Sequence, residues 1–157
     1  MEQPITRQAY ERLQQELQRL ENEELPKVVE RMKRAREFGD LSENAEYDAS
    51  KEQYQRLQEQ INNLRMRLSR CRIVEEDEIP RDRVAFGARV RIYDETFEEE
   101  EVYEFVSPGE DDIFENKILI TSPLGQALLG KKVGDVVEFQ APGGVRKLKI
   151  LEISYPF

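Results

Sequence analysis

The chain has 157 residues, of which 36% are charged and 38% hydrophobic, and it contains no tryptophan. This composition suits one or two small domains with much solvated surface rather than one large core. The absence of histidine excludes Ser-His-Asp triads, histidine general bases and histidine metal sites, and a single cysteine, Cys71, excludes an internal disulfide and a Cys-rich zinc site. No stretch resembles a signal peptide or reaches membrane-spanning length, so we expect a cytoplasmic protein with no membrane partner.

The net charge of −9 is unevenly distributed along the chain. Residues 1–74 carry 14 basic and 14 acidic side chains, whereas residues 75–157 carry 10 basic and 19 acidic ones. Such asymmetry predicts two domains with different partners. The acidic second half is a poor candidate for binding nucleic acid, since its field repels phosphates.

The first predicted element is a helix over residues 6–38, with Thr6 as its N-cap. Apolar residues recur at coiled-coil steps of three and four, at Tyr10, Leu13, Leu17, Leu20, Leu25, Val28, Met32 and Ala35. The register slips by one residue between Leu20 and Leu25, beside Pro26, where we expect the proline to kink the helix. At 1.5 Å per residue this arm is about 50 Å long.

Residues 38–48, FGDLSENAEYD, follow this helix and contain Gly39, the only glycine of the first 86 residues. Glycine ends helices readily because it adopts positive φ without a Cβ penalty. We therefore expect the first helix to end here, and Asp40 or Ser42 to cap the next one by accepting backbone N–H bonds.

The second helix, predicted over residues 43–73, has an unbroken seam at Tyr47, Ser50, Tyr54, Leu57, Ile61, Leu64, Leu68 and Cys71. Because two arms of matched length are joined by a short turn, we predict an antiparallel coiled-coil hairpin over residues 1–74, in a monomer. On this seam Cys71 is a small core residue rather than a reactive thiol. The alternative is a coiled coil that pairs between two chains and has an inert tip.

The second half predicts a small β domain over residues 84–157. Residues 75–83 are acidic, contain Pro80 and lack periodicity, which indicates a linker. Apolar residues then alternate in five short runs, at 88–93, 102–106, 118–121, 136–139 and 148–153. Ser122-Pro123 at the start and Gly130 at the end predict one short helix between them. The fold class is α+β: the helical hairpin, then a small antiparallel sheet with one helix.

Asp40 and Glu43 are the candidate chemical groups of the predicted tip. Their spacing fits a capping box, in which Asp40 caps the helix and Glu43 reaches back to its amide. At the end of a long arm, however, two carboxylates are presented to a distant target. They can supply one or two ligands to Mg²⁺, which takes its other oxygens from water, a partner or substrate phosphates. Both interpretations stay open.

Basic residues gather beside this acidic pair. Between residues 27 and 36 only Glu30 opposes five basic side chains. A charge run usually does no more than solvate a helix, but beside an acidic tip it also fits contact with a polynucleotide backbone. The candidates for phosphate contact are Arg31, Lys33, Arg34 and Arg36.

Two motifs carry a resemblance to a known family: GDLSENAEY at residues 39–47 and SPLGQALLGKKVGD at residues 122–135. In this order they resemble the bacterial Gre transcript cleavage factors, with a GreA-like tip, and the resemblance covers essentially the whole chain. It implies an FKBP-like fold for residues 84–157, which docks on bacterial RNA polymerase. The docking residues taken from the second motif are Ser122, Pro123, Leu124 and Leu128.

The resemblance also implies a mechanism. The hairpin enters the secondary channel of the polymerase, and Asp40 and Glu43 help to hold a Mg²⁺ that is shared with the polymerase and not stably bound by the free factor. The polymerase then cuts the RNA at the nascent 3′ end of a backtracked complex, so the resemblance implies that the chain is not itself an enzyme. It also implies DNA binding as part of the transcription complex. The alternatives are an FKBP-like prolyl isomerase or chaperone, and a non-cleaving polymerase regulator. Inhibitory relatives have altered tips, whereas this tip keeps both acids.

Overall fold

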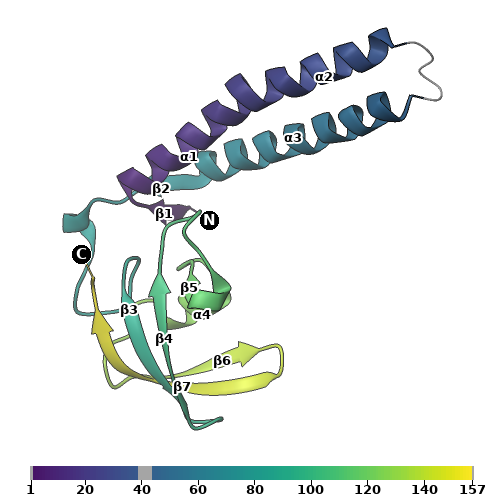
Figure 1. Cartoon of the computed structure of the whole chain (residues 1–157). Coiled ribbons are helices and arrows are strands. Elements are labelled where there is room, and N and C mark those ends of the chain that lie inside the picture. Colours follow the sequence, from purple (N-terminus) through teal and green to yellow (C-terminus); the bar gives the residue numbers. More distant parts are fainter. Residues whose placement is uncertain (1, 39–43, 157) are drawn as a thin grey trace. The chain divides into compact units, whose positions relative to one another are not determined.

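The computed structural model describes residues 2–38 and 44–156. It divides into two compact units, one formed by Tyr10–Arg70 and the other by Met1–Ala9 together with Cys71–Phe157. The predicted fold class is confirmed: a long helical hairpin is followed by a small β domain with one short α-helix (Figure 1). No helix among the described residues is long and apolar enough to cross a membrane.

The hairpin consists of two antiparallel helical arms. The first arm comprises α1 (Arg7–Arg19), a π-helical segment (Leu20–Glu24) and α2 (Leu25–Glu37), and the second is α3 (Ala45–Arg70). Figure 1 shows the arms side by side. Their seam closes within one chain around a cluster of buried residues that the heptad spacing predicts, namely Leu20, Val28, Leu57 and Ile61.

The π-helical segment accounts for the slip in the seam of the first arm. The N–H of Leu25 donates to the carbonyl of Leu20, five residues back, so this turn holds one residue more than an α-turn. Leu20 and Leu25 both face the seam as a result. Pro26, which has no N–H to donate, follows directly. The predicted irregularity beside Pro26 therefore takes the form of one wide turn.

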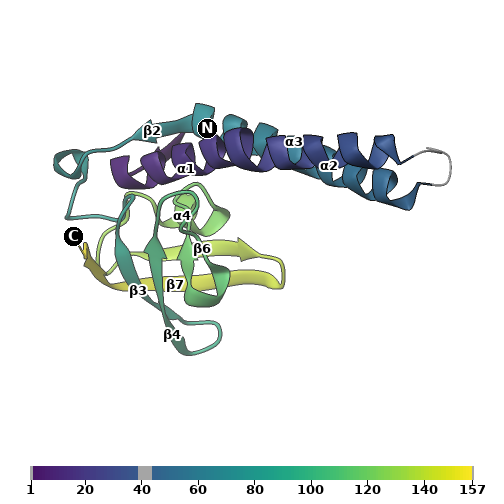
Figure 2. The same ribbon diagram turned by 45° about the horizontal axis from the view of Figure 1, so that its top comes forward.

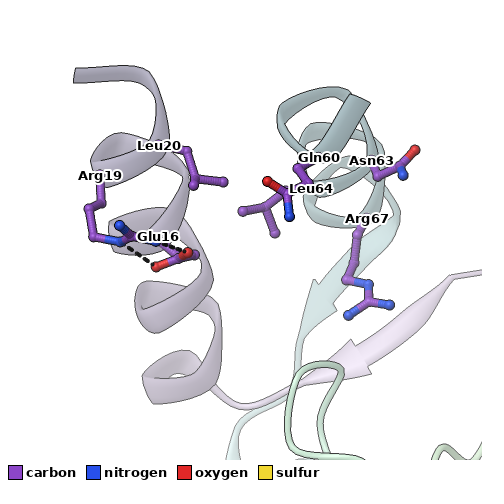
Figure 3. Close-up of a pocket in the computed structure, with 7 residues that line it drawn as sticks. All are labelled: Glu16, Arg19, Leu20, Gln60, Asn63, Leu64 and Arg67. Carbon is purple, nitrogen blue, oxygen red and sulfur yellow. Dashed lines mark hydrogen bonds and ion pairs between the residues drawn. The ribbon is translucent and has the colours of Figure 1, made fainter. Parts of the chain in front are cut away.

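An open hollow of about 380 Å³ lies beside this wide turn. Figure 3 shows Leu20 and Leu64 pointing toward each other across the seam, with Gln60 and Asn63 on the α3 side. Arg19 is held by Glu16 at 2.7 Å and by Glu24 at 3.1 Å.

The ends of the arms differ in how well the sequence predicts them. Thr6 caps α1 as predicted, because its Oγ1 accepts from the N–H of Ala9 at 3.1 Å. The end of α3 lies three residues earlier than predicted, at Arg70. The next three residues form strand β2 (Cys71–Ile73), which pairs in parallel with β1 (Gln3–Ile5). Cys71 is therefore a half-buried strand residue and not part of the helical seam.

The β domain is a curled five-stranded sheet with the order β5-β4-β3-β7-β6. Its strands are β3 (Arg89–Asp94), β4 (Glu99–Phe105), β5 (Lys117–Ile118), β6 (Val136–Ala141) and β7 (Gly144–Ser154). Neighbours are antiparallel except β4 and β5, so the predicted antiparallel sheet is in fact mixed. Helix α4 (Pro123–Leu128) lies beside β6 (Figure 2).

The core of this unit extends beyond the predicted domain of residues 84–157. It includes Val74 and, packed against it, Ile79 from the segment predicted as a linker. Ile5 is fully buried and its carbonyl accepts from the N–H of Val74 at 2.9 Å, while the N–H of Thr6 donates to Ser107 Oγ at 3.0 Å. The N-terminal strand and residues 71–74 thus belong to the β unit, whereas the predicted domain bounds place residues 1–74 in the hairpin.

One buried ion pair fixes the turn between β3 and β4. Asp94 has no exposed surface, and its Oδ2 accepts from Arg146 Nε at 2.6 Å and Nη2 at 2.5 Å. Its Oδ1 accepts from the backbone N–H of Thr96 at 2.8 Å and of Phe97 at 3.2 Å. Arg146 lies on β7, so the pair fastens the turn to the neighbouring strand.

Candidate functional site at the hairpin tip

Asn44 joins the two arms where they meet. Its Oδ1 accepts from the N–H of Tyr47 at 3.0 Å, which caps α3, and its Nδ2 donates to the carbonyl of Ala35 at 2.5 Å. One side chain thus satisfies a donor at the start of α3 and an acceptor in the last turn of α2. Asparagine is among the best N-cap residues. The sequence alone favoured Asp40 or Ser42 for this role, so the prediction of the cap is wrong.

This cap bears directly on the two acids of the predicted tip. Asp40 and Glu43 lie outside the described residues. A capping box with Asp40 as N-cap requires the helix to begin at residue 41. Helix α3 begins at Ala45 with Asn44 as its cap. A capping box with Asp40 as N-cap therefore does not begin α3. The cap of α3 is Asn44, and it requires neither Asp40 nor Glu43.

The next carboxylate along the chain, that of Glu46, forms an ion pair with Arg31. Glu46, in the first turn of α3, accepts from Arg31 Nε at 2.6 Å, and Arg31 Nη1 donates to Gln53 at 2.5 Å. The hydrogen bond from Arg31 holds the pKa of Glu46 below its usual value, and the same bond raises the pKa of Arg31. Arg31 therefore links α2 to α3, and Glu46 stays ionised beside it.

The other predicted phosphate contacts differ in their surroundings. Arg34 pairs with Glu30 at 3.2 Å, one turn back on the same exposed helix face. Arg36 donates to the hydroxyl of Tyr47 at 3.3 Å and lies over its ring, 5.6 Å from the centroid. Lys33 is exposed and makes no ion pair within the described part of the chain. Of the four predicted contacts, Arg31 and Arg36 thus both contact the opposite arm, Arg31 through an ion pair with Glu46 and Arg36 through the hydroxyl and ring of Tyr47.

The predicted docking residues on α4 have unequal access to solvent. Ser122 caps the helix, since its Oγ accepts from the N–H of Gly125 at 3.1 Å. Leu128 is fully buried in the core and Leu124 is half-buried against it. The side chain of Leu128 has no exposed surface and is therefore not available for docking. Pro123 is exposed, and so is Leu129, at 46%.

No cluster of three or more His, Cys, Asp or Glu side chains suited to a metal ion occurs in residues 2–38 and 44–156. The acidic pair of Asp40 and Glu43 adds only two carboxylates, from the segment that joins α2 to α3. Two carboxylates are too few for a complete magnesium cage. A metal at this place needs further ligands from another molecule.

The chain thus combines a helical hairpin, whose two arms are joined by a segment with acidic residues, with a second compact unit built on a small β-sheet. The family model described as "Transcription elongation factor, N-terminal" matches residues 3–73. The model described as "Transcription elongation factor, GreA/GreB, C-term" matches residues 79–155. The chain belongs to the GreA/GreB family of transcription elongation factors.

Individual relatives agree with the family models. Transcription elongation factor GreA of Trichlorobacter lovleyi is 45% identical over 152 residues, which are 97% of this chain and 96% of the relative. The GreA of Thermoanaerobacter pseudethanolicus is 44% identical over 149 residues, 95% of each chain. Among solved structures, the GreA factor homolog 1 (Gfh1) of Thermus thermophilus is 32% identical, with 98% of this chain and 99% of that chain covered and a TM-score of 0.48.

The cap assignment predicts different effects of neighbouring substitutions on stability. Asn44→Ala removes the cap of α3 and the hydrogen bond from Asn44 Nδ2 to the carbonyl of Ala35, so we expect a loss of about 1–2 kcal/mol in the free energy of unfolding. Asp40→Ala and Glu43→Ala should each change it by less than about 0.5 kcal/mol. Urea unfolding followed by circular dichroism measures both. A loss for Asp40→Ala as large as for Asn44→Ala would restore Asp40 as the cap.

Proposed function

We propose that the chain stimulates the RNA-cleaving activity of bacterial RNA polymerase, acting on the nascent RNA 3′ end of a backtracked complex. In this proposal the hairpin enters the secondary channel and presents Asp40 and Glu43 to the polymerase active site. The observation that carries the proposal is the cap by Asn44, because it leaves two carboxylates in the α2–α3 connection that the helix does not need. Family membership supports the same role.

The donor set fits Mg²⁺. Carboxylate oxygens are hard ligands that this ion prefers, and the usual remainder of its coordination comes from water and substrate phosphates. Asp40 and Glu43 would hold the ion, and Glu46 would not join them because Arg31 occupies it. A bound magnesium supplies charge neutralisation at a phosphodiester and favours ionisation of water. The chain's own carboxylates raise the occupancy of the site and keep it negatively charged.

The hydrolysis itself would belong to the polymerase. The chain has no histidine to act as a general base. Its two tip carboxylates can complete a metal site but cannot form one alone. Addition of the chain to a stalled, backtracked polymerase should therefore shorten the RNA from its 3′ end. RNA of unchanged length would reject cleavage and favour a non-cleaving regulator of the polymerase.

We expect the β unit to supply docking on the polymerase. A chain in which a short Gly-Ser linker replaces residues 10–70 keeps β1, β2 and the buried Ile5, which residues 75–157 alone would lack. At large excess this shortened chain should displace the full chain and suppress most of the cleavage. Competition is measured by RNA cleavage at a fixed concentration of full chain.

Two exposed positions of the β unit provide a matched comparison. In the shortened chain, Pro123→Glu on α4 should weaken competition, whereas Val145→Glu, at a position 49% exposed on β7, should not. If the shortened chain did not compete with the full chain, the docking surface would have to lie on the hairpin. The same protein in a peptide isomerisation assay tests the prolyl isomerase alternative.

A further inference from the structure

Two large apolar side chains, Ile113 and Phe114, are held in solvent by the segment that connects β4 to β5 (Figure 1). Ile113 is 77% exposed and Phe114 is 95% exposed. Phe97, between β3 and β4, is also exposed, but its ring lies over Arg146, whose guanidinium carbon is 5.2 Å from the ring centroid. Ile113 and Phe114 do not belong to the core of the β unit, and adjacent exposed apolar side chains of this size are typical of interaction surfaces.

Hydrogen bonds define the conformation of this segment. A short 3-10 helix (Ile113–Glu115) carries both side chains, and Asp112 caps it through Oδ1, which accepts from the N–H of Phe114 at 3.0 Å. Asp112 and Lys117 exchange two backbone hydrogen bonds, at 2.7 Å and 2.9 Å. Asn116 ends the helix in the left-handed region, at φ 54°, and its carbonyl accepts from a backbone N–H of β4 at 3.0 Å. The turn is therefore preformed, which lowers the cost of binding through it.

Carboxylates precede and follow the two apolar side chains. Glu110, Asp111 and Glu115 are all exposed, and none of them makes an ion pair within the described residues. Elsewhere on the sheet acidic side chains do have cationic partners, as Glu104 has in Arg89. The segment thus presents an apolar centre with a negative border, the arrangement of an interface core and its polar rim.

We propose that Ile113 and Phe114 form the centre of a docking surface for a protein, and that the partner offers an apolar pocket bordered by lysine and arginine side chains. Side chains that enter such pockets carry much of the binding energy of protein interfaces, and aromatic ones are prominent among them. The negative border selects a positively charged surface and speeds association with it. Nucleic acids and anionic membranes do not fit, because the border repels their phosphates.

Because the β unit docks on RNA polymerase in the proposed function, we place the partner pocket there, and this placement rests on that proposal. The surface adds a second contact to the one expected at α4, since Ile113 and Phe114 lie outside residues 122–135. Two side chains are too small an area for a stable complex by themselves, so the two contacts act together. A symmetric dimer of the chain fits less well, because the two negative borders would face each other.

Binding of the full chain to core RNA polymerase in the absence of RNA tests the apolar contact, with both rate constants measured by biolayer interferometry. Phe114→Ser should weaken binding by about tenfold or more and Ile113→Ser by about fivefold, mainly through faster dissociation. Phe97→Ser is the matched control, since it removes the same atoms at another exposed position of the β unit, and it should stay within about twofold of the parent. All three variants should melt close to the parent, because the side chains lie at the surface.

The rate of association tests the negative border. Glu110→Gln combined with Glu115→Gln should slow association by about threefold at 50 mM salt and reduce its salt dependence. Asp112 stays in place because it caps the 3-10 helix. Glu98→Gln combined with Glu138→Gln removes the same charge at exposed positions outside this segment and should leave the salt dependence nearly unchanged.

Unchanged polymerase binding by Phe114→Ser, or an equal loss in Phe97→Ser, would overturn the proposal. A doubled mass of the chain in solution that Phe114→Ser abolishes would also overturn it, because the surface would then bind a second copy. If Phe114→Ser binds like the parent while the parent stimulates cleavage, only the docking surface is rejected. If Phe114→Ser loses binding while the parent fails to shorten RNA, the docking surface stands and the proposed function is rejected.

Discussion

Replacing Asp40 with asparagine and Glu43 with glutamine is expected to reduce factor-stimulated RNA cleavage by at least about 100-fold. The substitutions keep the size of each side chain but remove the negative charge that Mg²⁺ requires. A metal that supplies several kcal/mol of charge stabilisation accounts for a rate effect of this order. The measurement is the rate of RNA shortening in a stalled complex at saturating factor.

The same double variant should fold and bind like the parent. Asn44 still caps α3 and still donates to the carbonyl of Ala35, so helicity and melting should not change. Asp48→Asn with Glu52→Gln is the matched control, since it removes two charges at exposed positions of α3. This control should cleave within about twofold of the parent. Full activity of the Asp40→Asn, Glu43→Gln variant would show that the tip acids do not hold a metal.

A large loss of stability is expected when the buried ion pair between Asp94 and Arg146 in the β domain is broken. Arg146→Met leaves the carboxylate of Asp94 buried without its cation, so we expect the free energy of unfolding to fall by about 3 kcal/mol. Arg89→Met is the matched control in the same sheet, because Arg89 pairs with Glu104 at 2.5 Å but is 48% exposed. The Arg89→Met variant should lose less than about 1 kcal/mol in the free energy of unfolding. Denaturant unfolding of both variants measures the difference, and equal losses would refute a special role for the buried pair.

Acid should weaken this pair in a defined pH range. Burial by itself raises the pKa of Asp94, but the hydrogen bonds from Arg146 and from the N–H groups of Phe97 and Thr96 outweigh it and hold the pKa below its usual value. The native state thus binds this proton more weakly than the unfolded chain does. The resulting stabilisation is fully present above the unfolded pKa of about 4 and is lost as the pH falls through the lower native pKa. Asp94→Asn should lack this part of the acid sensitivity.

The hairpin could be predicted from the sequence because its seam is a periodic signal. Steps of three and four place Val28 on the seam face of the first arm and Leu57 and Ile61 on the seam face of the second, and these residues are buried together. The one-residue slip near Pro26 also marked the place of the π-helical segment. The form of this irregularity, a turn with one extra residue, could not be predicted, because the spacing shows only that the seam shifts by one residue.

Non-local contacts account for most of what the sequence could not show. Strand β1 has three residues and contains Pro4, so its pattern carries no strand signal, and its partner β2 lies 68 residues away. Leu128 belongs to a motif shared with the Gre factors, but only the fold shows that its side chain is buried. The cap by Asn44 could have been considered, since asparagine is a strong N-cap, but two competing cap residues, Asp40 and Ser42, lie within the same segment.

In the proposed function, the tip acids raise the occupancy of a magnesium site in the polymerase. This role can be tested by the magnesium concentration that gives half-maximal RNA cleavage in a backtracked complex. It should be compared without factor, with the parent chain at saturation and with the Asp40→Asn, Glu43→Gln variant at saturation. We expect the parent to lower this concentration at least about tenfold and the variant to return it to the factor-free value. The same half-maximal magnesium concentration in all three reactions would show that Asp40 and Glu43 do not contribute to magnesium binding.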